Sequence, residues 1–128
     1  MVLDSSVVIA ILLGEPEAGA FEDAIQQSSR CLMSAASVVE CTIVLRKRLG
    51  ASGVARLDRF IEGWPVSVRG IDLDQLGWAR HAVETYGRGQ HPAKLNFGDC
   101  FSYALAKSSG EPILYKGTDF SLTDLATA

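Results

Sequence analysis

The sequence has few histidines and cysteines, the side chains that serve as imidazole bases and thiol nucleophiles in many enzymes. Its 128 residues include two histidines, His81 and His91, and three cysteines, and no two cysteines stand at CxxC spacing. Because the cysteines are odd in number, Cys31, Cys41 and Cys100 cannot all pair within the chain. Neither histidine forms a recognisable motif with a cysteine. We therefore expect reduced thiols, as is usual in the cytosol, and no catalytic cysteine.

The sequence also lacks a long apolar run. The longest, residues 7–13, is much shorter than the roughly 18 residues that a membrane span needs. It follows Asp4 and has no basic segment before it, which is unlike a signal peptide. We expect a soluble, cytoplasmic protein that makes no membrane contact.

Basic residues are in slight deficit. The chain has 12 Lys and Arg against 15 Asp and Glu, which gives a net charge of −3. A protein that coats nucleic acid is usually strongly basic, so the charge excludes that type of binding. It does not exclude a nucleic-acid substrate, because removing the charges of the four candidate metal-binding acids described below leaves a slightly basic remainder.

Composition and patterning predict an α/β fold. The chain is 48% hydrophobic and 21% charged, which is typical of a folded domain. Short apolar segments that favour strands cover residues 1–4, 31–33, 65–69 and 113–115. Segments that favour helices cover residues 5–13, 16–28, 34–49, 51–62, 72–86 and 97–108. Such alternation produces right-handed βαβ crossovers and a parallel sheet. We expect residues 1–128 to form one domain, with a central parallel sheet of four to five strands flanked by helices.

Four acidic residues stand at the end of a predicted strand or near the beginning of a predicted helix. They are Asp4, Glu40, Asp99 and Asp119. Functional sites of parallel sheets lie outside the carboxyl ends of the strands, so the four side chains are expected to converge on one edge. Carboxylates in one cleft repel each other unless a cation lies between them. The pattern predicts a divalent-metal site that acts on a phosphate-bearing substrate.

Each acid taken alone also has a simpler explanation. Asp4 is placed to cap the first helix. Glu40 stands three residues after Ser37, and Asp99 follows its own helix cap at the same spacing, as in a capping box. Asp119 follows Gly-Thr, as turn residues do. Caps and turns do not explain why all four acids fall at one edge of the sheet.

The segments around the acids form a more specific pattern when they are taken together. They are residues 4–6 (DSS), 34–40 (SAASVVE), 96–106 (NFGDCFSYALA) and 114–120 (LYKGTDF). In this order and at these distances, they closely resemble the VapC toxins, PIN-domain nucleases of bacterial and archaeal toxin–antitoxin pairs. The similarity spans the whole chain.

The resemblance implies a Mg²⁺- or Mn²⁺-dependent endoribonuclease, in which water attacks the phosphodiester in line. The metal-binding and catalytic residues then correspond to Asp4, Glu40, Asp99 and Asp119. Metal ions supply the activated water and the charge stabilisation that this chemistry needs, without a histidine or cysteine.

Three further residues take supporting positions in the same comparison. Ser6 is expected to hold Asp4 by a hydrogen bond. Thr118 stands where many relatives carry an acid or an asparagine beside the fourth acid, which weakens the hold on a second metal ion. Asp124 is an additional candidate contributor to the metal site.

The resemblance also implies partners. A cognate VapB-type antitoxin, encoded beside the toxin, would hold it inactive in a hetero-oligomer by lying along the groove between the first helices and inserting a basic side chain into the acidic site. The toxin itself would be a homodimer, and the substrate would be RNA, either tRNA or rRNA. Lys116, Lys94 and Arg88 flank the acidic segments and are candidates to contact the RNA backbone.

Two other functions fit part of the pattern. A Mg²⁺-binding phospho-acceptor domain of the receiver type needs an acid pair after the first strand and a phosphorylatable aspartate after the third. Here the third predicted strand ends at Arg69, so this alternative fits poorly. A PIN fold that acts only as a binding module is the other alternative, and the four intact acids argue against it.

Overall fold

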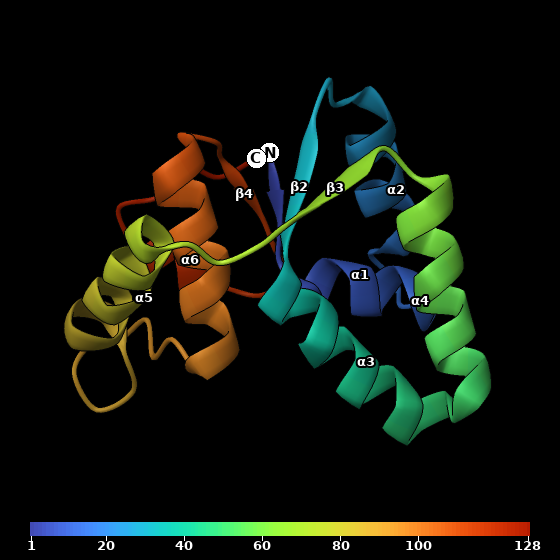
Figure 1. The fold of residues 1–128 in the computed structure, drawn as a ribbon, viewed down its shortest axis with the longest axis horizontal. Helices are drawn as coiled ribbons and strands as arrows, with labels where there is room; N and C mark the ends of the chain where they lie inside the picture. The colour runs from blue at the N-terminus through green and yellow to red at the C-terminus, as the bar shows by residue number, and fades with distance from the viewer.

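A four-stranded parallel sheet lies between two layers of helices in the computed structural model, which describes residues 1–128 (Figure 1). Its strands, in the order β3-β2-β1-β4, are β3 (Val66–Arg69), β2 (Cys31–Ser34), β1 (Val2–Leu3) and β4 (Ile113–Leu114). The helices are α1 (Ser5–Leu12), α2 (Ala18–Gln27), α3 (Ala35–Leu49), α4 (Ala51–Gly63), α5 (Leu73–Tyr86) and α6 (Phe97–Ser109). A 3₁₀ turn, η1 (Asp119–Leu122), follows β4. The predicted α/β fold is confirmed, and its parallel sheet has four of the four to five strands that we expected.

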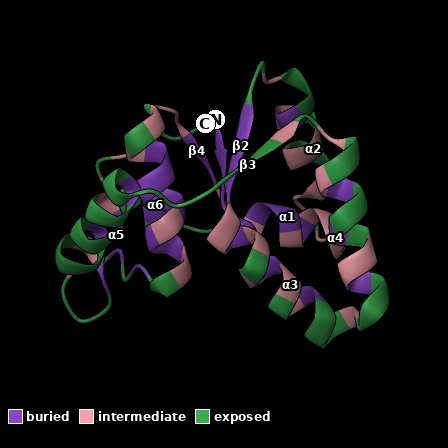
Figure 2. Cartoon of the chain, viewed as in Figure 1, coloured by how far each residue is buried: buried purple, intermediate pink, exposed green.

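Strand side chains divide the core into two parts, one on each face of the sheet. Successive residues of a strand point to opposite faces. Val2 and Leu32 therefore pack with α5 and α6, whereas Leu3 and Met33 pack with α1 to α4. Figure 2 shows β1 and β2 buried along their length, while β3, at the edge of the sheet, is largely exposed. Burial on both faces explains why the central strands are apolar up to Ser34, the last residue of β2.

The carboxyl ends of the strands lie at one edge of the sheet. Two helices begin there, each directly after a strand. Asp4 directly follows β1 and caps α1, and Ser34 ends β2 and caps α3 by accepting a hydrogen bond from the Ala36 amide at 3.2 Å. The backbone of Asp4 also donates to the Leu114 carbonyl at 3.0 Å, which ties this point to β4. The edge predicted to hold the acids is thus rigidly built.

One helix boundary differs from the prediction. We expected the second helix to begin at Pro16, but α2 begins at Ala18. The Glu15 amide bonds back to the Ala10 carbonyl, and the Ala18 amide bonds to the Glu15 carbonyl, so these residues close a turn after α1. No helix of the structure is both long enough and apolar enough to span a membrane.

Candidate active site

Asp4 is the most firmly held of the four acids. It is 3% exposed. Its Oδ2 accepts hydrogen bonds from the Ser6 amide at 3.0 Å and from Ser6 Oγ at 2.6 Å, and its Oδ1 accepts one from Ser102 Oγ at 2.7 Å. The predicted hydrogen bond from Ser6 is therefore present, and so is the predicted capping of α1. The carboxylate has a fixed orientation before any ligand binds.

Glu40 lies within α3 and turns toward the first acid. Its Oε2 accepts a hydrogen bond from Ser5 Oγ at 2.9 Å. Burial raises the pKa of this carboxyl, the Ser5 hydrogen bond acts against that rise, and the negative charge of Asp4 adds to it. The alternative capping box with Ser37 is wrong, because Ser37 lies inside the helix and its hydroxyl is paired with Ser102 Oγ at 3.2 Å.

Asp99 both caps a helix and faces the other acids. Its Oδ2 accepts from the Asn96 amide at 2.9 Å, and its own amide donates to Asn96 Oδ1 at 2.9 Å, which is the predicted capping box. Burial raises the pKa of Asp99 to about 7, the Asn96 amide opposes that rise, and the negative charges of Asp4, Asp119 and Glu40 add to it. The charges of all four acids therefore act at one place.

Asp119 approaches the cluster from β4. It begins the turn η1 and is exposed, unlike Asp4 and Asp99. Thr118, which precedes it, makes no capping hydrogen bond through its side chain. The fourth acid is thus the least constrained of the set.

The four carboxylates share one edge of the sheet without closing around one point. No three acidic, histidine or cysteine side chains lie close enough together to hold a metal ion by themselves. The donors are all oxygen, which suits Mg²⁺ and Mn²⁺. Mg²⁺ usually keeps several waters and uses one or two carboxylates directly. An open arrangement of oxygens is compatible with an ion that keeps most of its water ligands.

The three basic residues predicted to contact RNA differ in whether they already form ion pairs within the chain. Lys116 is already paired with Glu15 and, at 3.3 Å, with Glu17. Arg88 and Lys94 are exposed and form no ion pair, and they lie in the loop between α5 and α6. These two remain available for a phosphate.

Asp124 lies outside the acidic cluster, so its prediction as a contributor is wrong. Its Oδ1 accepts from the Tyr103 hydroxyl at 2.9 Å, and its Oδ2 binds Lys107 Nζ at 2.8 Å. These bonds lower its pKa against the effect of burial. The residue fastens the C-terminal segment to α6.

The sequence interpretation missed three residues at the site: Ser5, Ser102 and Gly98. Ser102 follows Asp99 by three residues, a spacing that places both on one face of a helix and that could have identified it. Ser5 had no such signal, because its contact with Glu40 spans 35 residues of sequence. Gly98 matters through its missing side chain: a Cβ at this position would lie 2.3 Å from Glu40 Oε2.

We expect Gly98→Ala to displace the Glu40 carboxylate. If the chain has the ribonuclease activity that the sequence predicts, this change should lower RNA cleavage roughly tenfold, because displacements of about 1 Å in a catalytic group are costly. Stability should change little, since only the end of a flexible side chain has to move. Gly77→Ala is the matched control: Gly77 is also helical, and a Cβ there meets nothing within 4 Å. Equal activities of the two variants would contradict a role for the Glu40 position.

The cysteines near the acids are unsuited to nucleophilic chemistry. Burial raises the pKa of Cys100 to about 11, and the charge of Asp99 adds to the rise. Burial, with the charges of Asp4 and Glu40, raises the pKa of Cys41 still further. These shifts favour the protonated thiol at neutral pH, which makes each a poor nucleophile.

Comparison with known proteins identifies relatives over nearly the whole chain. A family model described as the PIN domain matches residues 1–125. Over 127 residues the chain is 46% identical to the VapC ribonuclease Mb0640 of Mycobacterium bovis, and the match covers 99% of this chain and 97% of that protein.

Solved structures support the fold. The Mycobacterium tuberculosis toxin VapC20, which cleaves the sarcin–ricin loop, has a TM-score of 0.81 at 17% identity, over 99% of this chain and 97% of that chain. A toxin–antitoxin complex from Klebsiella pneumoniae has a TM-score of 0.76 at 16% identity, over 99% of this chain and 95% of that chain.

Proposed function

The chain belongs to the VapC family of PIN-domain ribonucleases, and from that premise we propose that it is an endoribonuclease that requires Mg²⁺ or Mn²⁺ and acts as the toxin of a type II toxin–antitoxin pair. The observation that carries the metal requirement is Asp99. Burial raises the pKa of its carboxyl to about 7, the Asn96 amide opposes that rise, and the negative charges of Asp4, Asp119 and Glu40 add to it. A divalent cation at this place would favour the ionised form of the carboxyl against both burial and the neighbouring charges.

In the proposed reaction, the acids bind the metal ion and serine hydroxyls orient the acids. The proposed metal-binding and catalytic residues are Asp4, Glu40, Asp99 and Asp119. A bound divalent ion supplies an activated water and stabilises the charge of the phosphate and of the leaving oxygen. The chain orients its acids in advance, by two serine hydroxyls at Asp4 and by one at Glu40. Water attacking the phosphorus in line with the 3′ oxygen would break the P–O3′ bond and leave a 5′-phosphate and, once the 3′ oxygen takes a proton, a 3′-hydroxyl.

Substrate binding is assigned to the free cations beside the site. Arg88 and Lys94 are the proposed contacts to the RNA backbone, since neither is paired within the chain. Lys116 is a weaker candidate because Glu15 and Glu17 already hold it.

The test is cleavage of total RNA by the purified protein with Mg²⁺ or Mn²⁺, with the cut ends mapped and their chemistry determined. Loss of cleavage in EDTA and 5′-phosphate products are the expected results. Cleavage that persists in EDTA would contradict metal dependence. Complete absence of cleavage in all metals would favour the binding-module alternative. The phospho-acceptor alternative has no structural support, because β3 ends at Arg69 and no acid closes it.

We propose a VapB-type antitoxin as a partner, supported by the similarity to a toxin–antitoxin complex. A groove of about 350 Å³ lies between α1, α2 and α4. Its apolar lining includes Leu12, Phe60 and Trp64, and the charged residues Glu22, Arg56 and Arg59 also line it. An apolar segment with flanking charged residues is complementary to it.

Leu12→Asp is expected to weaken binding of the antitoxin encoded by the neighbouring gene about tenfold, because it places a charge in an apolar groove. RNA cleavage by the free toxin should remain. Calorimetric titration of the antitoxin into each variant measures the change. Leu76→Asp, at a 45% exposed position on α5, serves as control. If the antitoxin still fully inhibits the Leu12→Asp variant, the antitoxin does not bind in this groove.

We also propose a homodimer. Exposed apolar side chains of α3, Val39 at 59% and Ile43 at 65% exposure, provide a surface for a second copy. Light scattering at micromolar concentration should give twice the mass of the chain, and Ile43→Lys should lower that mass toward the monomer. A monomer mass for the folded wild-type protein would disprove the dimer.

A further inference from the structure

The segment that carries Asp119 is tied to the rest of the chain by a single residue. Residues 115–118 lie outside any helix or strand, and Gly117 among them has a φ of 100°, a conformation that is open mainly to glycine. Lys116 makes every hydrogen bond and ion pair that joins residues 115–119 to the chain before β4 or after η1. The place of Asp119 therefore depends on how Lys116 is held.

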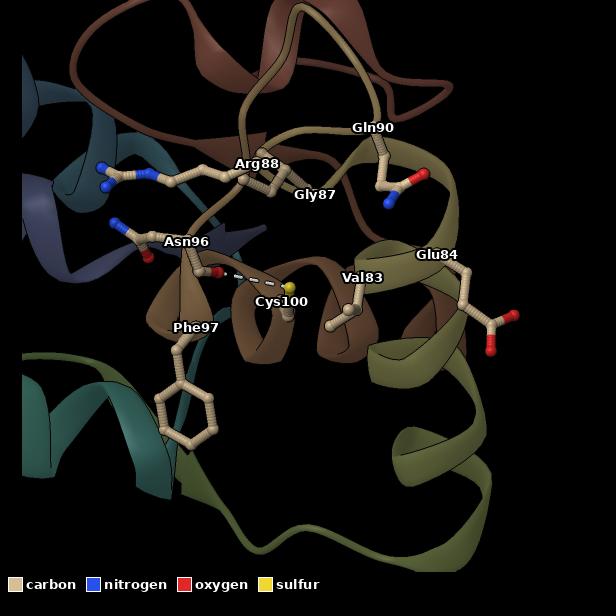
Figure 3. Close-up of a pocket in the computed structure, with 9 residues that line it drawn as sticks. Val83, Glu84, Gly87, Arg88, Gln90, Asn96, Phe97 and Cys100 are labelled. Carbon is tan, nitrogen blue, oxygen red and sulfur yellow. Dashed lines mark hydrogen bonds between the residues drawn. The ribbon is translucent and has the colours of Figure 1, made fainter.

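Asp99 shows the contrast, because its own helix holds it. Asp99 and Asn96 exchange hydrogen bonds, and beside them the Cys100 thiol donates to the Asn96 carbonyl at 3.2 Å (Figure 3). Asp119 has no such support, although its negative charge acts on Asp99. Since like charges repel, Asp119 would move away from the other acids unless its segment were held.

The backbone of Lys116 reaches the first acid through a serine. The Lys116 amide donates to Ser6 Oγ at 3.0 Å, and Ser6 Oγ donates to Asp4 Oδ2 at 2.6 Å. A serine hydroxyl has one proton and two lone pairs, so the amide occupies a lone pair and the proton stays on the carboxylate. Lys116 thus lies between Asp4 and Asp119 in the chain of contacts.

The side chain of Lys116 is anchored to the turn between α1 and α2. Its Nζ binds Glu15 and, at 3.3 Å, Glu17. The turn is itself closed by backbone hydrogen bonds, from the Glu15 amide to Ala10 at 2.9 Å and from the Ala18 amide to Glu15 at 3.0 Å. Hydrogen bonds to Glu15 and then Glu17 raise the pKa of Lys116, which keeps the contact charged at neutral pH.

We propose that Glu15 and Glu17 are positioning residues, which hold Lys116 and so set the separation of the first and fourth acids. The inference rests on the proposed function, and it adds residues that assemble the metal site without touching the ion or the RNA. Two other roles are possible for the same contacts. Partly exposed ion pairs often contribute little to any property. The glutamates could also act on the metal ion through their charge alone.

The binding of Mn²⁺ to the metal-free protein separates these roles. The dissociation constant is measured from the electron paramagnetic resonance signal of free Mn²⁺, for the wild-type protein, Glu15→Gln/Glu17→Gln, Lys116→Met and the triple variant. Positioning predicts that the double variant and Lys116→Met each weaken binding about fivefold, and that the triple variant is no weaker than either, because all remove one interaction. Charge alone predicts the opposite sign for Lys116→Met, since the loss of a positive charge near the acids strengthens binding.

Cleavage of RNA provides a second measurement. The substrate is an RNA hairpin that contains a cut site mapped in total RNA, at a Mn²⁺ concentration that half-saturates the wild-type protein. In both variants kcat should fall while KM stays unchanged, and excess Mn²⁺ should restore much of the loss. Lys116→Arg keeps the ion pairs and should retain activity. Asp23→Asn is the matched control, because Asp23 is an exposed acid of α2 that forms no ion pair.

Unchanged or tighter Mn²⁺ binding by Lys116→Met would overturn the inference. So would losses that add in the triple variant, or a cleavage defect confined to KM, which would make Lys116 a contact to RNA. Thermal melts establish that each variant is folded. If the wild-type protein binds Mn²⁺ but cleaves no RNA, the nuclease proposal fails, and the Mn²⁺ titration still decides this inference. If the wild-type protein binds no Mn²⁺, both are disproved.

Discussion

Replacing Asp4 by Asn should lower metal-dependent RNA cleavage by roughly a hundredfold to ten-thousandfold, because charge stabilisation by a bound ion contributes several kcal/mol to such reactions. The asparagine keeps the shape of the side chain, so the contacts with Ser6 and Ser102 can largely persist. What it removes is the negative charge of the most firmly oriented acid at the site. The measurement is kcat/KM on the mapped RNA hairpin across a Mg²⁺ and Mn²⁺ titration.

Asp124→Asn is the matched control for that experiment. Asp124 is also held by two side chains of α6, yet it lies outside the acidic cluster, so cleavage should be unchanged. Circular dichroism and thermal melts should show that both variants are folded. Undiminished cleavage by Asp4→Asn, from a preparation free of contaminating nuclease, would remove Asp4 from the mechanism.

A second large effect is expected in the stability of the metal-free protein. Asp99 has an ordinary pKa of 3.8, which rises to about 7 in the fold. Between these values the folded state binds more protons than the unfolded state, so stability falls as the pH rises through this range. Above it, the loss should reach roughly 2 kcal/mol, less than the full shift implies because the carboxyl keeps some contact with water.

The Asp99→Asn variant isolates this effect. In EDTA, the melting temperature of the wild-type protein should fall relative to that of the variant between pH 4 and pH 8, by roughly 5–10 °C. Mg²⁺ added at pH 8 should raise the melting temperature of the wild-type protein and have little effect on the variant. If the melting temperatures of the two proteins depend on pH in the same way, with or without Mg²⁺, the ionisation of Asp99 does not destabilise the fold.

Local signals in the sequence identified most of the elements that position the site. The capping residues Asp4 and Asn96, together with the apolar strand β1, predicted where the first and last helices begin, because caps depend on neighbouring residues alone. Glu40 was harder to interpret. Its spacing from Ser37 suggested a local capping box, but its partner is Ser5, from a different helix. Contacts that join distant segments leave no periodic trace in a single sequence.

The same limit applies to the geometry of the proposed metal site. Parallel topology predicted that the four acids share an edge of the sheet, and the charges that act on Asp99 agree with that. The topology did not predict how open the arrangement is, because side-chain separations depend on packing around Gly98 and Ser102. Lys116 was likewise judged by its position in the sequence, which gave no sign of its pairing with Glu15, 101 residues away.

That pairing bears on how the enzyme would be controlled. By holding Lys116, Glu15 and Glu17 keep the lysine that follows β4 from serving as a counter-charge for the acids. Under the proposed function, the site then takes its positive charge from outside, either from a divalent ion or from a basic side chain of a bound antitoxin. Under that proposal both would act on the same negative charge, so the activity would depend on the concentration of free metal relative to that of the antitoxin.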